Sequence, residues 1–360
     1  MRFYVLTVLI TINLALKAQI VKYSNEFLNI GVGARALGMG NTGVASTTGA
    51  YSGYWNPAGL LQQKPDLEVA LMHAEYFAGI AKYDFMAASK RIDSNSVAGI
   101  TILRFGVDNI PNTLDLVDAN GNVDYSRIKT FNAVDFACLL SYARTIPKLK
   151  GVELGGNFKI IRRRLGEFGG AWGFGLDAGA RYNYKGWQFG ALGRDITGTF
   201  NAWSYNLTDD QKAVFAQTGN EIPSNSLEVT MPKIIFGASK TFLFWKDRIS
   251  TSGELNLINT FDGLRNTVIK SDLWSLEPAF GIEVGYKGFV FLRGGVGNIQ
   301  KQYDPLGTKQ ITSFQPNFGV GIKYRIFTLD YALTDIGDRS LALYSNIFSL
   351  KIDFNKKQNK

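Results

Sequence analysis

Residues 171–185 read AWGFGLDAGARYNYK, and their side chains change in type from each residue to the next. Aromatic and aliphatic residues occupy every second position, whereas glycine and charged or amide residues fill most of the positions between them. A period of two is typical of a β-strand with two unlike faces. The stretch is longer than the ~5–6 residues of an average soluble strand. It therefore predicts a long strand with one apolar face and one polar, glycine-bearing face.

The same alternation recurs along the chain, most clearly in residues 273–287, 314–326 and 342–354. The fourteen expected strands are 66–77, 80–92, 96–106, 131–146, 151–164, 171–185, 187–199, 229–244, 248–260, 273–287, 289–296, 314–326, 327–334 and 342–354. We expect the apolar face of each strand to touch lipid and the polar face to line a filled or wet interior. A soluble barrel would place its apolar residues inside.

Short and long connections alternate between these strands. Tight turns are expected at 93–96, 147–151, 184–187, 244–247, 286–289 and 324–327. Longer connections are expected at 107–130, 165–170, 200–228, 261–272, 297–313 and 335–340. If the strands run up and down, the tight turns share one end and the longer loops the other, as in outer-membrane barrels with short periplasmic turns. The sequence thus predicts an all-β, fourteen-stranded antiparallel transmembrane barrel.

The first residues predict a secretory signal peptide, 1–18. Arg2 is followed by a mostly apolar run that ends near a small residue, Ala18. A membrane anchor is the alternative, but the run is shorter than the ~20 residues that a spanning helix needs. The remaining chain divides into an N-terminal plug or hatch segment (19–65), the barrel (66–354) and a periplasmic tail (355–360). We expect an exported protein of the cell outer membrane.

Composition excludes several classes of function. With one Cys, Cys138, the chain cannot form an internal disulfide, and its one His, His73, lacks the partners of a catalytic triad. We therefore expect no catalytic residue, no metal site and no cofactor, and we expect that the protein is not an enzyme. The net charge of +9 comes without a nucleic-acid-binding motif, so outer-membrane lipid, including lipopolysaccharide, is the expected partner and nucleic acid is not.

Small residues dominate the segment before the first strand. Gly38, Gly40 and Gly43 match the pattern G-x-G-x-x-G, which in a dinucleotide site requires a βαβ unit around it. No such unit follows here. The glycines are better explained by close backbone packing in a narrow space.

Four short motifs carry a family resemblance: residues 33–40 (GARALGMG), 55–60 (WNPAGL), 329–333 (LDYAL) and 338–340 (DRS). They resemble the PorV/PorQ family, within the wider group of barrels similar to the FadL long-chain fatty-acid transporters. The resemblance implies a fourteen-stranded barrel whose N-terminal segment folds into the lumen. The implied plug motif comprises Gly38, Gly40, Gly43, Trp55, Asn56, Pro57, Ala58 and Gly59, with Asn56 capping a short helix that Pro57 begins.

The resemblance also implies a function. A PorV/PorQ-like protein would be an outer-membrane component of the type IX protein secretion system, binding a larger translocon barrel, secreted proteins or both. The alternative is a FadL-like transporter of long-chain fatty acids or other hydrophobic compounds. A secretion partner should combine apolar external loops with a sealed lumen. A transporter should show an apolar pocket near the plug and a lateral opening in the wall.

Two surface sites are expected at the long-loop end. Arg162, Arg163 and Arg164 end a strand there, and alternate arginines would meet the phosphates of lipopolysaccharide. The loop 200–228 carries Trp203, Tyr205, Leu207 and Phe215, which predict a contact surface for a partner, and residues 209–217 predict a short helix within it.

Overall fold

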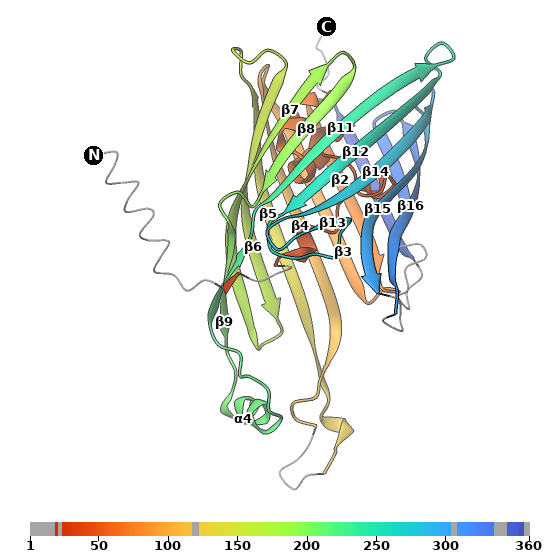
Figure 1. Cartoon of the computed structure of the whole chain (residues 1–360). Coiled ribbons are helices and arrows are strands. Elements are labelled where there is room, and N and C mark those ends of the chain that lie inside the picture. Colours follow the sequence, from red (N-terminus) through yellow and green to blue (C-terminus); the bar gives the residue numbers. More distant parts are fainter. Residues whose placement is uncertain (1–18, 21–23, 117–121, 304–307, 335–343, 356–360) are drawn as a thin grey trace, which may run out of the picture.

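The computed structural model describes residues 19–20, 24–116, 122–303, 308–334 and 344–355. The signal peptide expected at 1–18, the loop at 335–340 with its motif 338–340, and the tail beyond residue 355 lie outside the described residues. A single antiparallel sheet winds from β2 to β18 and closes where β18 pairs with β2. The predicted fourteen-stranded transmembrane barrel is confirmed (Figure 1).

The wall of the barrel consists, in chain order, of β2 (Leu67–Tyr76), β3 (Ala81–Asp93), β4 (Ser96–Asn112), β5 (Lys129–Thr145), β6 (Val152–Leu165), β7 (Gly169–Tyr184), β8 (Trp187–Arg194), β9 (Thr199–Tyr205), β10 (Ser226–Thr230), β11 (Lys233–Phe244), β12 (Ile249–Thr260), β14 (Ser275–Tyr286), β15 (Val290–Tyr303), β16 (Gln310–Tyr324), β17 (Phe327–Thr334) and β18 (Ser345–Phe354). In the described part of the chain, β8 with β9 and β10 with β11 each make one interrupted pass, which leaves fourteen passes. The two-residue strands β1 (Gln19–Ile20) and β13 (Ile269–Lys270) pair with β10 and β14.

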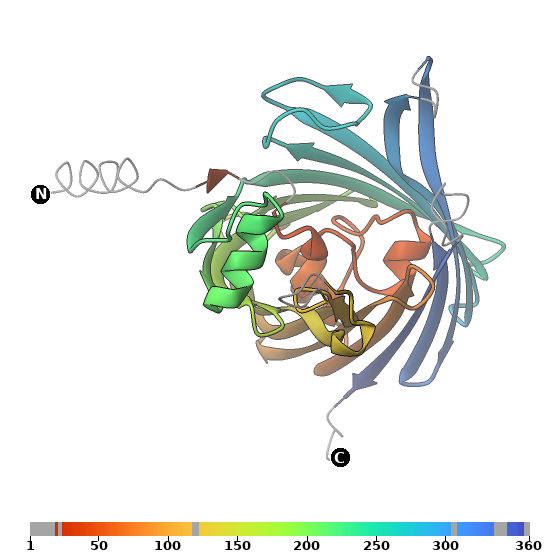
Figure 2. The ribbon, with the colours of Figure 1, turned by 90° about the horizontal axis from the view of Figure 1, so that it is seen from below.

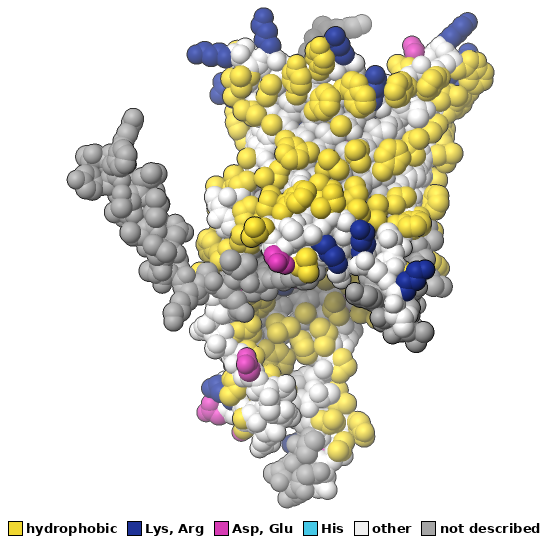
Figure 3. Space-filling view, in the orientation of Figure 1, with side chains coloured by type: hydrophobic (Ala, Val, Ile, Leu, Met, Phe, Trp, Pro, Cys, Tyr) yellow, Lys and Arg dark blue, Asp and Glu magenta, His cyan; other side chains and the backbone are white. Residues whose placement is uncertain are grey.

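The two faces of the wall differ as the alternation predicts. Trp172 is 53% exposed on the outside of β7, whereas Asp177 on the same strand is 4% exposed and faces inward. Figure 3 shows hydrophobic side chains covering the barrel wall, with Lys and Arg gathered at the rim of tight turns. The outer surface therefore suits lipid, and the polar groups lie inside.

Two neighbouring strands are interrupted side by side. β8 ends at Arg194 and β9 begins at Thr199, while β10 ends at Thr230 and β11 begins at Lys233. Left-handed backbone at Asp195 and Gly198 bends the chain between β8 and β9. Pro232, which has no N–H to donate, lies between β10 and β11.

These interruptions correct two predictions. Residues 187–199 are not one continuous strand, and residues 200–228 are not all loop, because they include β9 and the start of β10. Strand β4 also runs on to Asn112, and β15 runs on to Tyr303, beyond the expected ends. The strict alternation of connections fails at β2–β3, where the long-loop end is joined by a short turn at residues 77–80.

Residues 24–65 lie inside the barrel (Figure 2). They form η1 (Glu26–Leu28), α2 (Ala34–Gly38), η2 (Gly49–Tyr51), α3 (Ser52–Trp55) and η3 (Pro57–Gln62). We call this segment the plug. Its buried apolar side chains, including Phe27, Val32 and Leu37, pack with inward residues of the wall such as Tyr83, Leu103 and Ile347. The main apolar core of the molecule thus lies between plug and wall.

Two segments project beyond the barrel at the long-loop end (Figure 1). One consists of the extended ends of β4 and β5 with η4 (Tyr125–Arg127). The other carries α4, which spans Asp209–Gln217 as predicted and begins with a capping box between Thr208 and Gln211. Among the described residues, no helix has the length and apolarity to cross a membrane.

Candidate functional site

Asn56 joins the plug to the wall. Its Oδ1 accepts the N–H of Ala58 at 3.2 Å, which caps the short helix that Pro57 begins. Its Nδ2 donates to the carbonyl oxygens of Val44 in the plug at 3.0 Å and of Ala180 in β7 at 3.1 Å. The neighbouring Trp55 donates from Nε1 to the carbonyl of Val32 at 2.9 Å. The Asn-Pro turn is thus fixed on both sides by hydrogen bonds.

The plug glycines lie where backbone meets backbone or a large side chain. A Cβ on Gly40, which has φ +70°, would lie 2.6 Å from the backbone nitrogen of Val296. A Cβ on Gly38 would lie 3.0 Å from Gly319, one on Gly43 would meet Trp55, and one on Gly59 would meet Arg181. Inward-facing glycines of the wall also allow the plug backbone to approach closely. This explains why the polar face of the strands carries many glycines.

Replacing Gly295 by alanine is expected to displace the plug and lower the free energy of unfolding by about 1–3 kcal/mol, the usual cost of overpacking. The new Cβ would lie 2.1 Å from the carbonyl carbon of Met39, which cannot move without shifting the plug. Gly294→Ala is the matched control, because the Cβ at this position has no neighbour nearer than 4.0 Å. Equal denaturant midpoints for the two variants would contradict this packing argument.

Buried charges hold the plug on its β14–β17 side. Arg35 of α2 donates twice to the carboxylate of Glu283, at 2.9 and 3.0 Å. Glu283 also accepts from Arg293 at 2.6 Å, and Arg293 reaches Asp330 at 2.8 Å. These four side chains form a continuous chain of ion pairs from β14 through β15 to β17. Charged side chains inside the barrel are thus paired with one another here.

A second network holds the opposite side. Lys159 lies 2.8 Å from Asp177 and also pairs with Asp195, at the interruption between β8 and β9. Arg194 donates to the carbonyl oxygens of Leu28 and Tyr54 in the plug, at 2.9 Å each. Its guanidinium also lies over the Tyr54 ring, 4.6 Å from the centroid. The strand interruption therefore coincides with an anchor of the plug.

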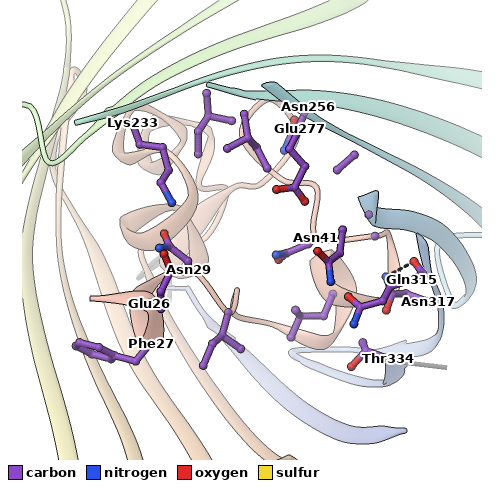
Figure 4. A pocket seen from close by; sticks show the side chains of 18 of the residues that line it. Glu26, Phe27, Asn29, Asn41, Lys233, Asn256, Glu277, Gln315, Asn317 and Thr334 are labelled. Carbon is purple, nitrogen blue, oxygen red and sulfur yellow. Dashed lines mark hydrogen bonds between the residues drawn. The ribbon is translucent and has the colours of Figure 1, made fainter. Parts of the chain in front are cut away.

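A cavity of about 650 Å³ lies between the plug and the long-loop ends of the strands (Figure 4). Much of its lining is polar: Asn29 and Asn41 come from the plug, and Asn256, Gln315 and Asn317 come from the wall. Lys233 and Glu277 project into it as well. Its apolar lining includes Phe27, Trp55 and Phe105. A pocket near the plug is what a transporter requires, although this one is more polar than the apolar pocket expected.

The barrel wall opens beside this cavity. Strands β14 and β15 pair from Tyr286 and Val290 only as far as Phe280 and Val296. Beyond that point Pro278 has no N–H to donate, and β15 carries a bulge with left-handed backbone at Asn298. Glu277 and Asn298, on the two sides of the opening, both line the cavity.

The loop 261–274 fills this opening. Its strand β13 pairs with β14 through Ile269 and Leu276, and Thr267 forms an isolated bridge with Gln300 of β15. Arg265 in the same loop binds Asp262 and reaches Glu26 of the plug at 3.3 Å. Partial burial would raise the pKa of Asp262, but the hydrogen bond and charge of Arg265 outweigh it and lower that pKa. The loop thus contacts wall, plug and cavity.

The three predicted surface arginines do not act together. Arg163 points inward and donates to Asp135 at 2.9 and 3.2 Å. Arg162 lies over the outward Trp172 ring, 5.1 Å from its centroid, and lines a shallow outer hollow with Arg164. Contact of this pair with lipopolysaccharide stays a prediction, and Arg163 is occupied elsewhere.

The predicted contact loop is also divided. Trp203 and Tyr205 lie in β9 and not in a loop, and Trp203 donates to Glu228 at 2.7 Å. Strand-forming residues continue to Tyr205, past residue 199, where the strand was expected to end. Leu207 and Phe215 remain in the projecting segment, with Phe215 in α4. A partner-binding role for these residues stays a prediction.

His73 lies on the outer face of β2, and its Nδ1 is 2.7 Å from Asp84 of β3, a neighbour that the sequence did not reveal. Within the described ranges, no group of three His, Cys, Asp or Glu residues is placed to hold a metal ion.

The fold is that of a FadL-like barrel. The chain aligns with CymD, a monoaromatic hydrocarbon channel, over 91% of its own length and 98% of that chain, with a TM-score of 0.55 and 12% identity. The toluene transporter TbuX of Ralstonia pickettii gives 0.51 and 14%, covering 90% of this chain and 99% of that chain. The toluene transporter TodX of Pseudomonas putida gives 0.51 and 11%, covering 89% and 96%.

No family model and no curated protein matches the chain. At these identities the likeness to solved structures concerns the fold alone. It supports the FadL-like part of the resemblance and adds nothing for the PorV/PorQ family.

Proposed function

We propose that this chain is an outer-membrane transport barrel that passes small molecules through the cavity at the long-loop end of the plug. The observation that carries the proposal is that this cavity adjoins the stretch where β14 and β15 part. A molecule that enters the cavity thus contacts the plug and also the part of the wall where β14 and β15 are not paired. The FadL-like fold, shared with hydrocarbon channels, supports this alternative more than it supports type IX secretion.

The anchoring of the plug favours the wall as the route. Ion pairs and hydrogen bonds from β7, β8 and β14 hold the plug on opposite sides. Removing it would leave several buried charges without partners, which is strongly unfavourable. Moving the loop 261–274 away from β15 and the plug strands fewer buried charges, because the loop meets β15 at the bridge of Thr267 with Gln300 and the plug at the contact of Arg265 with Glu26. We therefore assign the loop as the mobile element.

Uptake into vesicles tests the proposal. Purified full-length protein in liposomes is expected to admit small solutes faster than empty liposomes, and Asn317→Trp is expected to reduce the rate at least fivefold by filling the cavity. Asn317 is buried at the cavity wall, whereas Phe318→Trp changes the adjacent, outward position and serves as the control. Rates that do not differ between the two variants would contradict passage through this cavity.

A second candidate function rests on the projecting segments. The ends of β4 and β5 and the helix α4 extend well beyond the barrel, a shape that suits contact with another protein (Figures 1 and 3). Such contact would fit a PorV/PorQ-like role in the outer membrane beside a larger translocon barrel or secreted proteins. Purification in mild detergent, with and without residues 206–225, separates the candidates: a large barrel or secreted proteins lost on deletion would favour secretion.

A further inference from the structure

Lys233 is a buried cation without a direct ion pair among the described residues. It begins β11 directly after Pro232, is 9% exposed, and points into the cavity (Figure 4). No described residue forms an ion pair or hydrogen bond with its ammonium group. The carboxylates of Glu26 and Glu277 lie on the same cavity wall and act on Lys233 through their charge, but neither contacts its ammonium group. Arg265 binds Glu26, and Glu277 accepts the N–H of Asn298.

Other buried cations of this barrel have direct ion-pair or hydrogen-bond partners. Lys159 meets two carboxylates and Arg293 meets two. Arg194, which forms no ion pair with a described carboxylate, donates to two backbone carbonyls. A charge taken out of water is unfavourable unless it is paired or hydrogen-bonded. Lys233 therefore needs water or an anion from outside the chain, and the cavity has room for a small molecule beside it.

The rest of the lining limits what that molecule can be. Amide side chains of Asn29, Asn41, Gln315 and Asn317 border the cavity. An alkyl chain or an unsubstituted aromatic ring pressed against these groups would remove their water and replace none of their hydrogen bonds. A ligand with hydroxyl or amide groups would replace them.

We propose that Lys233 binds the charged group of a small polar organic anion, such as a hydroxylated carboxylic acid, and that this is the class of molecule the cavity carries. The inference rests on the proposed transport function and departs from the hydrocarbons named for the structurally similar channels. The ammonium group supplies the charge selectivity, and the amides on the far side of the cavity bind the uncharged polar groups.

The test uses four probes with the full-length protein: galacturonate, galactose, palmitate and toluene. Galacturonate and galactose share their ring hydroxyls and differ in the carboxylate. We expect galacturonate to bind at least tenfold more tightly than galactose, and Lys233→Met to remove this preference. Lys240→Met is the control, since Lys240 lies farther along the same strand against the rings of Trp187 and Phe242. Lys233→Arg, which keeps the charge, is expected to retain the preference within threefold.

The outcomes separate the two proposals. Equal binding of galacturonate and galactose, or an unchanged preference in a folded Lys233→Met barrel, overturns the role of Lys233. A larger increase over empty liposomes for palmitate or toluene than for galacturonate overturns the ligand class and leaves the transport function standing. Uptake of all four probes no faster than in empty liposomes overturns both. If Lys233→Met fails to fold, the loss of preference in Lys233→Gln, compared with Lys233→Arg, decides the question.

Discussion

Replacing Arg293 by methionine is expected to lower the free energy of unfolding by about 3–5 kcal/mol, the usual effect of removing one partner from a buried ion pair. Arg293 lies between Glu283 and Asp330, at 2.6 and 2.8 Å, and all three side chains are buried. Without it, Asp330 loses its partner and Glu283 keeps only Arg35 of the plug. Denaturant unfolding in detergent, followed by tryptophan fluorescence, measures the loss.

Two further variants make this prediction specific. Arg325→Met removes an arginine from a tight turn, where the side chain is exposed against Tyr324, and is expected to change stability by less than about 0.5 kcal/mol. Adding Asp330→Asn to Arg293→Met removes the stranded charge and should recover part of the loss. A loss below about 1 kcal/mol in Arg293→Met would show that this network does not hold the plug.

Fastening the loop 261–274 to β15 is expected to slow solute uptake at least tenfold. The variant carries Thr267→Cys and Gln300→Cys in a Cys138→Ala background, because Cys138 is the one natural cysteine. Thr267 and Gln300 are directly opposite in an antiparallel bridge, where Cβ atoms lie about 4.5–5.5 Å apart, so a disulfide needs a small shift. A reducing agent should restore the rate of the unmodified barrel.

The control disulfide joins Thr241→Cys with Ser252→Cys, a pair of β11 and β12 near the tight-turn end, remote from the cavity. It is expected to form without altering uptake. If the Thr267–Gln300 disulfide forms completely and uptake is unchanged, the route does not pass through this section of the wall. Passage through the cavity would then be judged by Asn317→Trp alone.

Much of the wall could be predicted from the sequence because lipid and interior impose opposite demands on alternate residues. The ridge of Trp172, Phe174 and Leu176 is exposed on β7, while Gly173 and Gly175 between them, and Asp177 after them, lie on the inward face. The helix at Asp209–Gln217 was also predictable from its own residues. The break in β8–β9 was not, since it depends on left-handed backbone at Asp195 and on the pairing of Asp195 with the distant Lys159.

The site was only partly predictable, because some of its parts are local in sequence and others depend on contacts between distant residues. The motif around Asn56 could be recognised because it is local. The cavity could not be predicted from any single stretch of sequence. The register of distant strands is what brings together Lys233, Glu277 and Asn298. Pro232 and Pro278 were the available signals, because proline within a strand marks an edge, a bulge or an interruption. The expected secretion role rested on the resemblance, and the structural likeness favours its alternative.

The order of synthesis places a constraint on how this molecule matures. Arg35 precedes its ion-pair partner Glu283 by 248 positions in the sequence. Ala45 precedes Glu254, which accepts its N–H, by 209 positions. The earliest-made part of the lumen therefore waits for some of the latest-made walls before its charges are neutralised. We expect docking of the plug to be the last step of folding, so that a partly assembled barrel is permeable and the completed barrel is not.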